Sequence, residues 1–422
     1  MVFMIDDFHQ SHQPPRHRKT HKIDTESFHT PEEVAATDSI ERSATIPIDS
    51  SVEASNNVEP TYMKHTHPKK QNSRFSFQWP PGKKEWGIIV CVVLLLAAGI
   101  TLALNHHTAK PVAVNLKPKI SVPLQPTTVP STLSGLPVNP SVNKQPVTGV
   151  MIENSTFARP QSGLGQASVV FEAIAEGGIT RFLALFQDTS PANVGPIRSA
   201  RPYFEQWALG FDAGYAHVGG SPEALADIKS WGVRNLDQFY NGAYYHRITT
   251  RAAPHNVYTS ISLLNQLEAK KGYGTSTFTG FARKAAAPSA HPTATSINLT
   301  LSGPTYNVHY DYVAKTNSYN RSEGGAPQID ANTNTQISPK VVVAIVMPYS
   351  LEADGYHSDY STIGNGTVYV FQDGVETKGQ WSKSSNNNQF VFTNSNGKSL
   401  TLDPGQTWLT AIAHSSDMSY SQ

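Results

Sequence analysis

The longest apolar stretch of the chain runs from Trp86 to Leu104 and contains neither a charged residue nor a proline. A helix of this length, rising about 1.5 Å per residue, just spans a hydrocarbon core of about 30 Å. Lysine and arginine are more frequent before the run than after it, which favours a cytoplasmic N-terminus. The pattern predicts a single transmembrane helix over residues 86–104, embedded in membrane lipid, with extracytoplasmic C-terminal domains. The alternative is a buried core helix, which normally shows a polar stripe.

The segments on either side of this run lack the apolar periodicity of a folded domain. Residues 1–85 are rich in His, Ser, Thr and Pro, and their composition predicts a disordered cytoplasmic tail. Its histidines are scattered, which favours a solvated tail over a metal site. Residues 105–145 carry a proline every few positions and predict a semi-extended, proline-rich linker.

Strands that alternate with helices predict an α/β or α+β domain with a mixed sheet over residues 146–285. A Gly177-Gly178 pair between two apolar runs predicts a tight hairpin. Ser221 and Pro222 are typical of a helix start. The strands are expected at Val147–Ile152, Ser168–Ala175, Ile179–Gln187 and Phe211–Val218, and the helices at Ser199–Leu209, from Ser221 to Trp231, and from a Thr259 cap toward Lys271.

The pattern changes in the last third of the chain to short strands separated by turn residues. Asp373-Gly374, Asn396-Gly397 and Pro404-Gly405 are strong turn signals between these strands. They predict a small, mostly β domain over residues 295–417.

Composition excludes several classes of function. The net charge is +1 and no basic stripe is present, which argues against a nucleic-acid partner. The one cysteine, Cys91, lies inside the apolar run, so the later domains have no thiol nucleophile and no cysteine zinc site. Neither a G-x-S-x-G nor an H-E-x-x-H motif occurs. We therefore expect no cofactor and no metal.

Two polar segments of the first domain favour an anion. Arg198 and Arg201 lie three residues apart at the start of a predicted helix, whose free backbone N–H groups attract negative charge. His217, Gly219, Gly220 and Ser221 form a predicted strand–loop–helix junction, and its glycines allow a ligand to approach the backbone closely.

Other polar residues flank these two segments. Glu172, Glu176 and Arg181 belong to the predicted hairpin, and His255, Asn256 and Tyr258 follow in a later loop. In one interpretation, Arg198 and Arg201 clamp a carboxylate or phosphate, and the acid–base candidates are His217, His255, Glu172 and Glu176. In the other, the arginines pair with Glu172, Glu176 or Glu205, and the glycines only turn the chain.

Long stretches of the chain resemble the YerB-like family, which comprises bacterial cell-envelope proteins with a two-part domain of unknown function. In the first part these stretches are FEAIAEGGITRFLALF, VGPIRSARPYF, HVGGSPEAL and APHNVYTS, and in the second they are VVVAIV, GQWSK and PGQTWL. The resemblance spans roughly residues 146–415 and implies an outward-facing location but no established reaction. Many members look like lipoproteins, so a transmembrane helix would be a departure. The motif residues carried over are Arg159, Glu172, Glu176, Arg181, Arg198, Ser199, Arg201, His217, Ser221, His255, Asn256 and Tyr258.

Three hypotheses of function remain open at this point. The leading one is an envelope protein that binds an anionic glycan, peptide carboxylate or phosphate in a cleft of the first domain. The second is a cell-wall hydrolase or transferase that uses His and Glu as acid–base groups. The third is an envelope scaffold with a cytoplasmic recruitment tail.

Overall fold

The computed structural model describes residues 94–99 and 127–422, which fall into two compact units, residues 1–113 and 114–422. In the first unit residues 94–99 are helical. No helix among the described residues is long and apolar enough to cross a membrane. This finding corrects the prediction of a single transmembrane helix. The rest of that run and the predicted tail, residues 1–85, lie outside the described residues.

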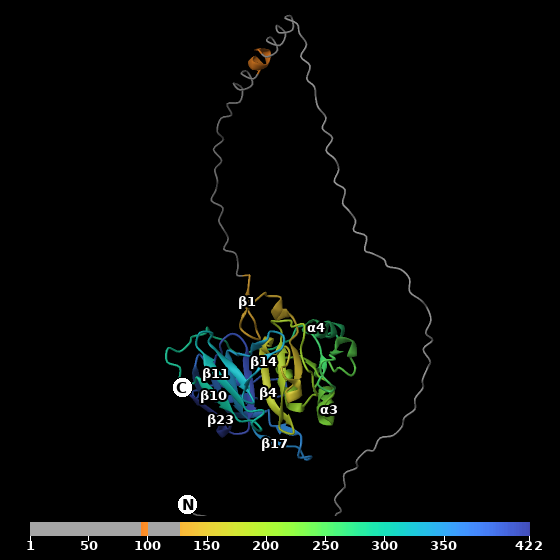
Figure 1. The fold of residues 1–422 in the computed structure, drawn as a ribbon, viewed down its shortest axis with the longest axis vertical. Coiled ribbons are helices and arrows are strands. Elements are labelled where there is room, and N and C mark those ends of the chain that lie inside the picture. Colours follow the sequence, from red (N-terminus) through yellow and green to blue (C-terminus); the bar gives the residue numbers. More distant parts are fainter. Residues whose placement is uncertain (1–93, 100–126) are drawn as a thin grey trace, which may run out of the picture. The chain divides into compact units, whose positions relative to one another are not determined.

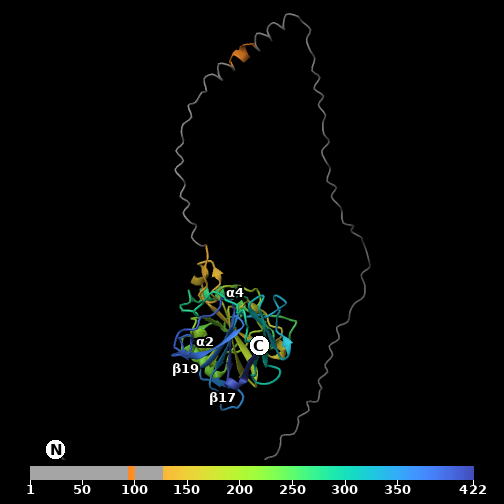
Figure 2. The same ribbon diagram turned by 90° about the vertical axis from the view of Figure 1, so that its left-hand side faces the viewer.

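The fold class of the second unit also differs from the prediction, because strands dominate it. Its α-helices are short: α2 (Pro202–Leu209), α3 (Pro222–Ser230) and α4 (Ile261–Lys270). Short 3₁₀ helices lie at Val142–Lys144, Thr156–Ala158, Leu164–Gln166, Gly242–Tyr244 and Ser415–Asp417. In both Figure 1 and Figure 2, α4 lies at the opposite end of this unit from β17 (Tyr349–Leu351). The unit is therefore a mostly-sheet structure and not an α/β domain followed by a small β domain.

One ten-stranded sheet forms the centre of this unit and contains strands from both predicted domains. Its order is β21 (Val391–Thr393), β20 (Val375–Lys383), β19 (Gly364–Gln372), β16 (Val341–Val346), β22 (Thr407–Ile412), β4 (Val169–Glu176), β5 (Ile179–Phe186), β3 (Thr148–Glu153), β6 (Gly214–Ala216) and β7 (Arg234–Asn235). The sheet runs through both predicted domains because β22 of the second domain pairs in parallel with β16 of the same domain and with β4 of the first.

Smaller sheets surround the central one. A five-stranded sheet has the order β13 (Ala326–Pro327), β12 (Ser318–Glu323), β11 (Val308–Val313), β10 (Ser296–Leu299) and β23 (Met418–Ser421). The two-stranded pairs are β1 (Val129–Pro130) with β2 (Pro137–Val138), β8 (His246–Arg247) with β9 (Val257–Tyr258), β14 (Ile329–Asp330) with β15 (Thr335–Gln336), and β17 with β18 (Ser358–Tyr360). The β1–β2 pair lies inside the stretch predicted as linker, and Leu133 between its strands is fully buried.

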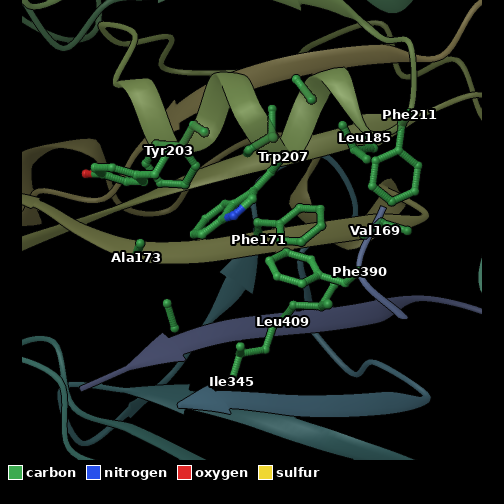
Figure 3. Close-up of a cluster of buried hydrophobic side chains, with 14 of the residues drawn as sticks. Val169, Phe171, Ala173, Leu185, Tyr203, Trp207, Phe211, Ile345, Phe390 and Leu409 are labelled. Carbon is green, nitrogen blue, oxygen red and sulfur yellow. The ribbon is translucent and has the colours of Figure 1, made fainter. Parts of the chain in front are cut away.

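Two hydrophobic clusters hold the central sheet, one on each face. In β4, Phe171 belongs to the first cluster and Val170 to the second, as expected when successive side chains point to opposite faces. Figure 3 shows Trp207 of α2 over Phe171, with Phe390 beyond it. The rings of Phe171 and Trp207 stack with centroids 5.2 Å apart. Because strands such as β4 are buried on both faces, their sequences read as continuous apolar runs.

Several local predictions are confirmed. The β4–β5 hairpin turns at Gly177 and Gly178, whose φ angles are 55° and 78°. Ser221 caps α3 by accepting a hydrogen bond from Ala224 N at 3.3 Å. The predicted cap of α4 is wrong by one residue, because Ser260 accepts from Leu263 N at 3.1 Å while Thr259 donates to Tyr244 O.

Candidate functional site

A cavity of about 1050 Å³ opens beyond the carboxyl ends of the parallel strands β6 and β7. This edge of a parallel strand pair is where α/β sheets commonly hold ligands. Its walls come from the loop after β6, from α3, and from the segments that follow β7 and β8. The residues that give it its chemistry are Arg198, Gly219, Gly220, Lys229, Asn235, Asp237, Phe239, Tyr240, Arg247 and Tyr273.

The glycine loop, Gly219 and Gly220, forms one wall of the cavity. Gly219 has a φ of 58°, and a Cβ atom there would lie only 2.8 Å from the Phe239 ring. Its N–H donates to Asp237 Oδ1 at 3.0 Å. A Cβ atom at Gly220 would lie 3.0 Å from Ala200 Cβ. Both positions therefore favour glycine, and the loop presents backbone to the cavity.

The cavity wall carries more positive than negative charge. Lys229 is exposed, and Arg247 Nη1 donates to Asn256 Oδ1 at 2.7 Å. Asp237 is the acidic residue among the lining residues, and it already accepts hydrogen bonds from the backbone N–H groups of Gly219 and Phe239. With Arg198, the wall has three cationic side chains against one carboxylate.

Two aromatic side chains at the cavity are unusually open to solvent. Phe239 is 70% exposed and Tyr240 is 84% exposed. Large aromatic side chains are normally buried, so such exposure at a cavity rim is typical of a surface that contacts another molecule.

Arg201, the predicted partner of Arg198 in an anion clamp, does not line the cavity. Its Nη2 lies 2.6 Å from Glu176 Oε2, and Arg181 pairs with the other oxygen of the same carboxylate. Burial would raise the pKa of Glu176, but Arg181 and Arg201 more than offset it and hold the pKa below its usual value. Glu176, Arg181 and Arg201 thus form an ion-paired group of the kind described in the second interpretation, in which the arginines pair with glutamates.

His217 is fully buried beneath the glycine loop. Its Nδ1 lies 2.8 Å from Gly219 O and its Nε2 lies 3.1 Å from Asn235 Oδ1. Burial lowers its pKa, against the opposing effect of Asp237. Both ring nitrogens of His217 are engaged, so the imidazole shapes the loop and has no free nitrogen for a ligand.

Glu172 is also remote from the cavity, at the centre of a buried network. Its two carboxylate oxygens accept from Arg321 Nη2 at 2.8 and 2.7 Å, and Trp408 Nε1 donates to it at 3.0 Å. Both Glu172 and Arg321 are fully buried. The carboxylate is saturated by these donors and links the two halves of the chain.

The loop of His255, Asn256 and Tyr258 divides between the cavity and the core. Asn256 holds Arg247 at the wall, whereas Tyr258 is buried in β9 behind Gly195. His255 Nδ1 lies 2.8 Å from Oε1 of Glu153, at the end of β3. The same oxygen lies 3.0 Å from Arg198 Nη2. The Glu153 carboxylate thus connects His255 to Arg198, which lines the cavity.

A separate group of possible metal ligands lies on the β17–β18 hairpin. Ligand atoms of Glu352, Asp354 and His357 lie within 4.8 Å of one another. Asp354 accepts from His357 Nδ1 and from the backbone N–H groups of Tyr356 and His357, and these hydrogen bonds lower its pKa to about 2. The carboxylate is therefore already used to form the turn.

Sequence reasoning missed several residues of the cavity and its border, namely Glu153, Lys229, Asp237, Phe239, Tyr240 and Arg247. The stretch NLDQFYN carried a usable signal, because two adjacent aromatic residues among polar ones do not fit a buried strand. Lys229 and Arg247 look like ordinary surface charges, and only the tertiary structure brings them to the cavity.

The fold and the site define a two-part, sheet-dominated protein with a cation-lined cavity in its first half. Residues 133–274 match the family described as "Protein of unknown function (DUF3048) N-terminal domain", and residues 297–409 match its C-terminal domain. The chain is 30% identical over 303 residues to "Putative lipoprotein YerB" of Bacillus subtilis (strain 168), an alignment that covers 71% of this chain and 91% of the relative. It therefore belongs to this YerB-like family, and the resemblance is confirmed.

A solved structure supports the same relationship. The crystal structure of the YerB protein from Bacillus subtilis matches with a TM-score of 0.64 at 30% identity. The match covers 70% of this chain and all of the solved chain (100%). The fold described above is thus shared with an experimentally determined relative.

Proposed function

We propose that this protein is a membrane-associated, extracytoplasmic binding protein that holds an anionic envelope ligand in the 1050 Å³ cavity. The location is supported by the name of its relative, "Putative lipoprotein YerB". The ligand class is supported by the excess of cationic side chains on the cavity wall. That excess is the observation on which the proposal depends.

The charges and the aromatic rings of the cavity favour a polyanionic glycan or polyol. Arg198, Arg247 and Lys229 come from different segments of the chain, and all three line the cavity. Phe239 and Tyr240 offer exposed ring faces, on which sugar or polyol carbons pack. Asp237 is satisfied by backbone N–H groups, which limits its repulsion of an anion.

Binding of defined polymers to the full-length chain tests the proposal. Poly(glycerol phosphate), inorganic polyphosphate and oligogalacturonate are the probes, and they separate phosphodiester, phosphate and carboxylate ligands. An Arg198→Gln/Arg247→Gln double variant should weaken binding about 100- to 10,000-fold, since each of the two lost charge-assisted hydrogen bonds contributes about 1.5–3 kcal/mol.

The matched control is Lys398→Gln, which removes an exposed cation outside the cavity and should leave binding unchanged. The proposal fails if none of the three polymers binds, or if the double variant and the control bind equally well.

For the hydrolase or transferase hypothesis, the contacts of the four acid–base candidates show which of them are free to act. Glu172 and Glu176 are committed to arginines and His217 has no free ring nitrogen. Of the two candidate histidines, His255 has a ring nitrogen without a hydrogen bond among the described residues. Its other ring nitrogen contacts Glu153, a carboxylate that the sequence did not single out.

A further inference from the structure

Glu153 and His255 form a compact polar cluster that reaches the cavity wall through Arg198. Glu153 Oε1 lies 2.8 Å from His255 Nδ1, 2.8 Å from Ser155 Oγ and 3.0 Å from Arg198 Nη2. The Glu153 side chain is 3% exposed and that of His255 is 20% exposed. A buried carboxylate thus supports a histidine that reaches solvent, while Arg198 connects both to the cavity wall.

The contact with Glu153 determines which nitrogen of His255 is free. A carboxylate only accepts hydrogen bonds, so Nδ1 carries the hydrogen and donates it. Nε2 then keeps its lone pair, and among the described residues no hydrogen bond is made to it. The ring centroid of Phe157 lies 5.3 Å from that of the imidazole. This arrangement is that of a histidine prepared to accept a proton.

The cluster is not a closed structural network. Glu153 Oε2 and Arg198 Nε are both buried, and neither has a hydrogen-bond partner among the residues described. Buried polar atoms of this kind are rare and call for a physical reason. The cluster around His217 differs, because both of its ring nitrogens are engaged.

We propose that His255 acts as the general base in the hydrolysis of a phosphodiester, with Glu153 as its positioning residue. This inference rests on the proposed function, because the cavity supplies the ligand. A phosphodiester fits because the reacting group is itself anionic and would be drawn to Arg198.

The reaction balances with water as the second reactant. The water oxygen attacks phosphorus and forms a new P–O bond while His255 Nε2 takes its proton. The P–O bond to the departing alcohol breaks on the opposite side of the phosphorus, and the proton taken by His255 reaches that oxygen through solvent water, which leaves a phosphate monoester and an alcohol. Glu153 keeps its contact with Nδ1 and stabilises the imidazolium, and Arg198 faces the charge on the non-bridging oxygens.

Hydrolysis assays on the full-length chain test this assignment. The probes are poly(glycerol phosphate) and the small diester bis(4-nitrophenyl) phosphate. His255→Gln should lower hydrolysis of both at least about 100-fold while poly(glycerol phosphate) still binds. The control is His309→Gln, which changes another carboxylate-paired histidine outside the cavity and should keep the wild-type rate.

The outcomes separate this inference from the proposed function. Polymer binding without hydrolysis of either probe overturns the role of His255 and leaves the binding function intact. Hydrolysis of the small diester without polymer binding supports His255 and overturns the binding function. Absence of hydrolysis of both probes, or a wild-type rate in His255→Gln, overturns the role of His255 whether or not a polymer binds.

The role of Glu153 has its own spectroscopic readout. Nitrogen-15 NMR of the imidazole should show the hydrogen on Nδ1 in the wild type and a mixture of both tautomers in Glu153→Leu, which removes the acceptor, with a rate about 10- to 100-fold lower in the folded variant. A wild-type His255 with its hydrogen on Nε2 would contradict the assignment.

Discussion

Glu205 lies in α2 with both carboxyl oxygens buried and without a hydrogen-bond partner among the described residues. Burial raises its pKa to about 9, with Asp227 and Glu223 adding to the effect. The unfolded chain releases this proton above pH 4.5, whereas the native state keeps it up to about pH 9. The native state thus binds more protons within this window, and its stability falls as the pH rises.

Replacement of Glu205 by glutamine should therefore stabilise the protein, and more so at high pH. We expect Glu205→Gln to raise the free energy of unfolding by on the order of 1–3 kcal/mol at pH 8 and by much less at pH 5. Urea unfolding of the variant and the wild type at both values measures the difference. Asp359→Asn, an exposed carboxyl change, is the control. An equal gain at both pH values would refute the explanation.

At the scale of residues, the sequence predicts chemical character but not which side chain meets which. Arg198, Gly219 and Gly220 line the cavity, whereas Arg201 pairs with Glu176. Only the tertiary structure distinguishes the two arginines, because in the sequence both lie at the start of the same predicted helix. Glu153 was missed because nothing near it in sequence reveals His255, which follows 102 positions later.

At the scale of elements, features set by neighbouring residues were predictable. The Gly177-Gly178 turn and the Ser221 cap depend on backbone conformation and local hydrogen bonds, and both are confirmed. The connection that leads out of the first predicted domain, around Arg283 and Lys284, is not held by neighbouring residues. Arg283 Nη2 donates to Leu133 O at 2.7 Å, and Lys284 Nζ lies 2.5 Å from Asp373 Oδ2 and also pairs with Asp403. Distant partners hold this segment, and they are invisible in its own composition.

Removal of Lys284 tests whether this connection stabilises the fold. Lys284→Met leaves Asp403, whose side chain is 1% exposed, beside Asp373 without a cation. We expect a loss of about 1–3 kcal/mol in the free energy of unfolding, measured by urea denaturation. Lys284→Met/Asp403→Asn should recover part of it, and Lys398→Met should have no effect. A single variant as stable as the wild type would show that these ion pairs contribute nothing.

At the scale of the whole unit, the pairing of β22 with β4 is the feature that the sequence did not predict. Thr407 lies opposite Val169 in this ladder, and no local signal joins strands so far apart in the chain. Alternation and turn residues predicted two separate domains, because each strand was interpreted with its sequence neighbours. The continuous ten-stranded sheet arises from contacts that only the folded chain contains.

The buried pair of Glu172 and Arg321 lies across this junction and gives it a measurable consequence. Arg321 belongs to β12 in the second half, Glu172 to β4 in the first, and the guanidinium also lies 4.4 Å from the Trp408 ring of β22. Arg321→Met leaves a buried carboxylate without its cation, which typically costs about 3–5 kcal/mol. Because one sheet joins both halves, we expect backbone amides of β5 and β19 to lose hydrogen-exchange protection together in this variant.

Restoration of charge balance supplies the control. Glu172→Gln/Arg321→Met removes the stranded charge and should recover part of the stability, since replacing both members of a buried pair is far less costly than removing one. Loss of protection in β19 while β5 stays protected would mean that the two halves unfold independently. In that case the shared sheet would be a contact between two domains, and the joint unfolding expected from the pairing of β22 with β4 would be wrong.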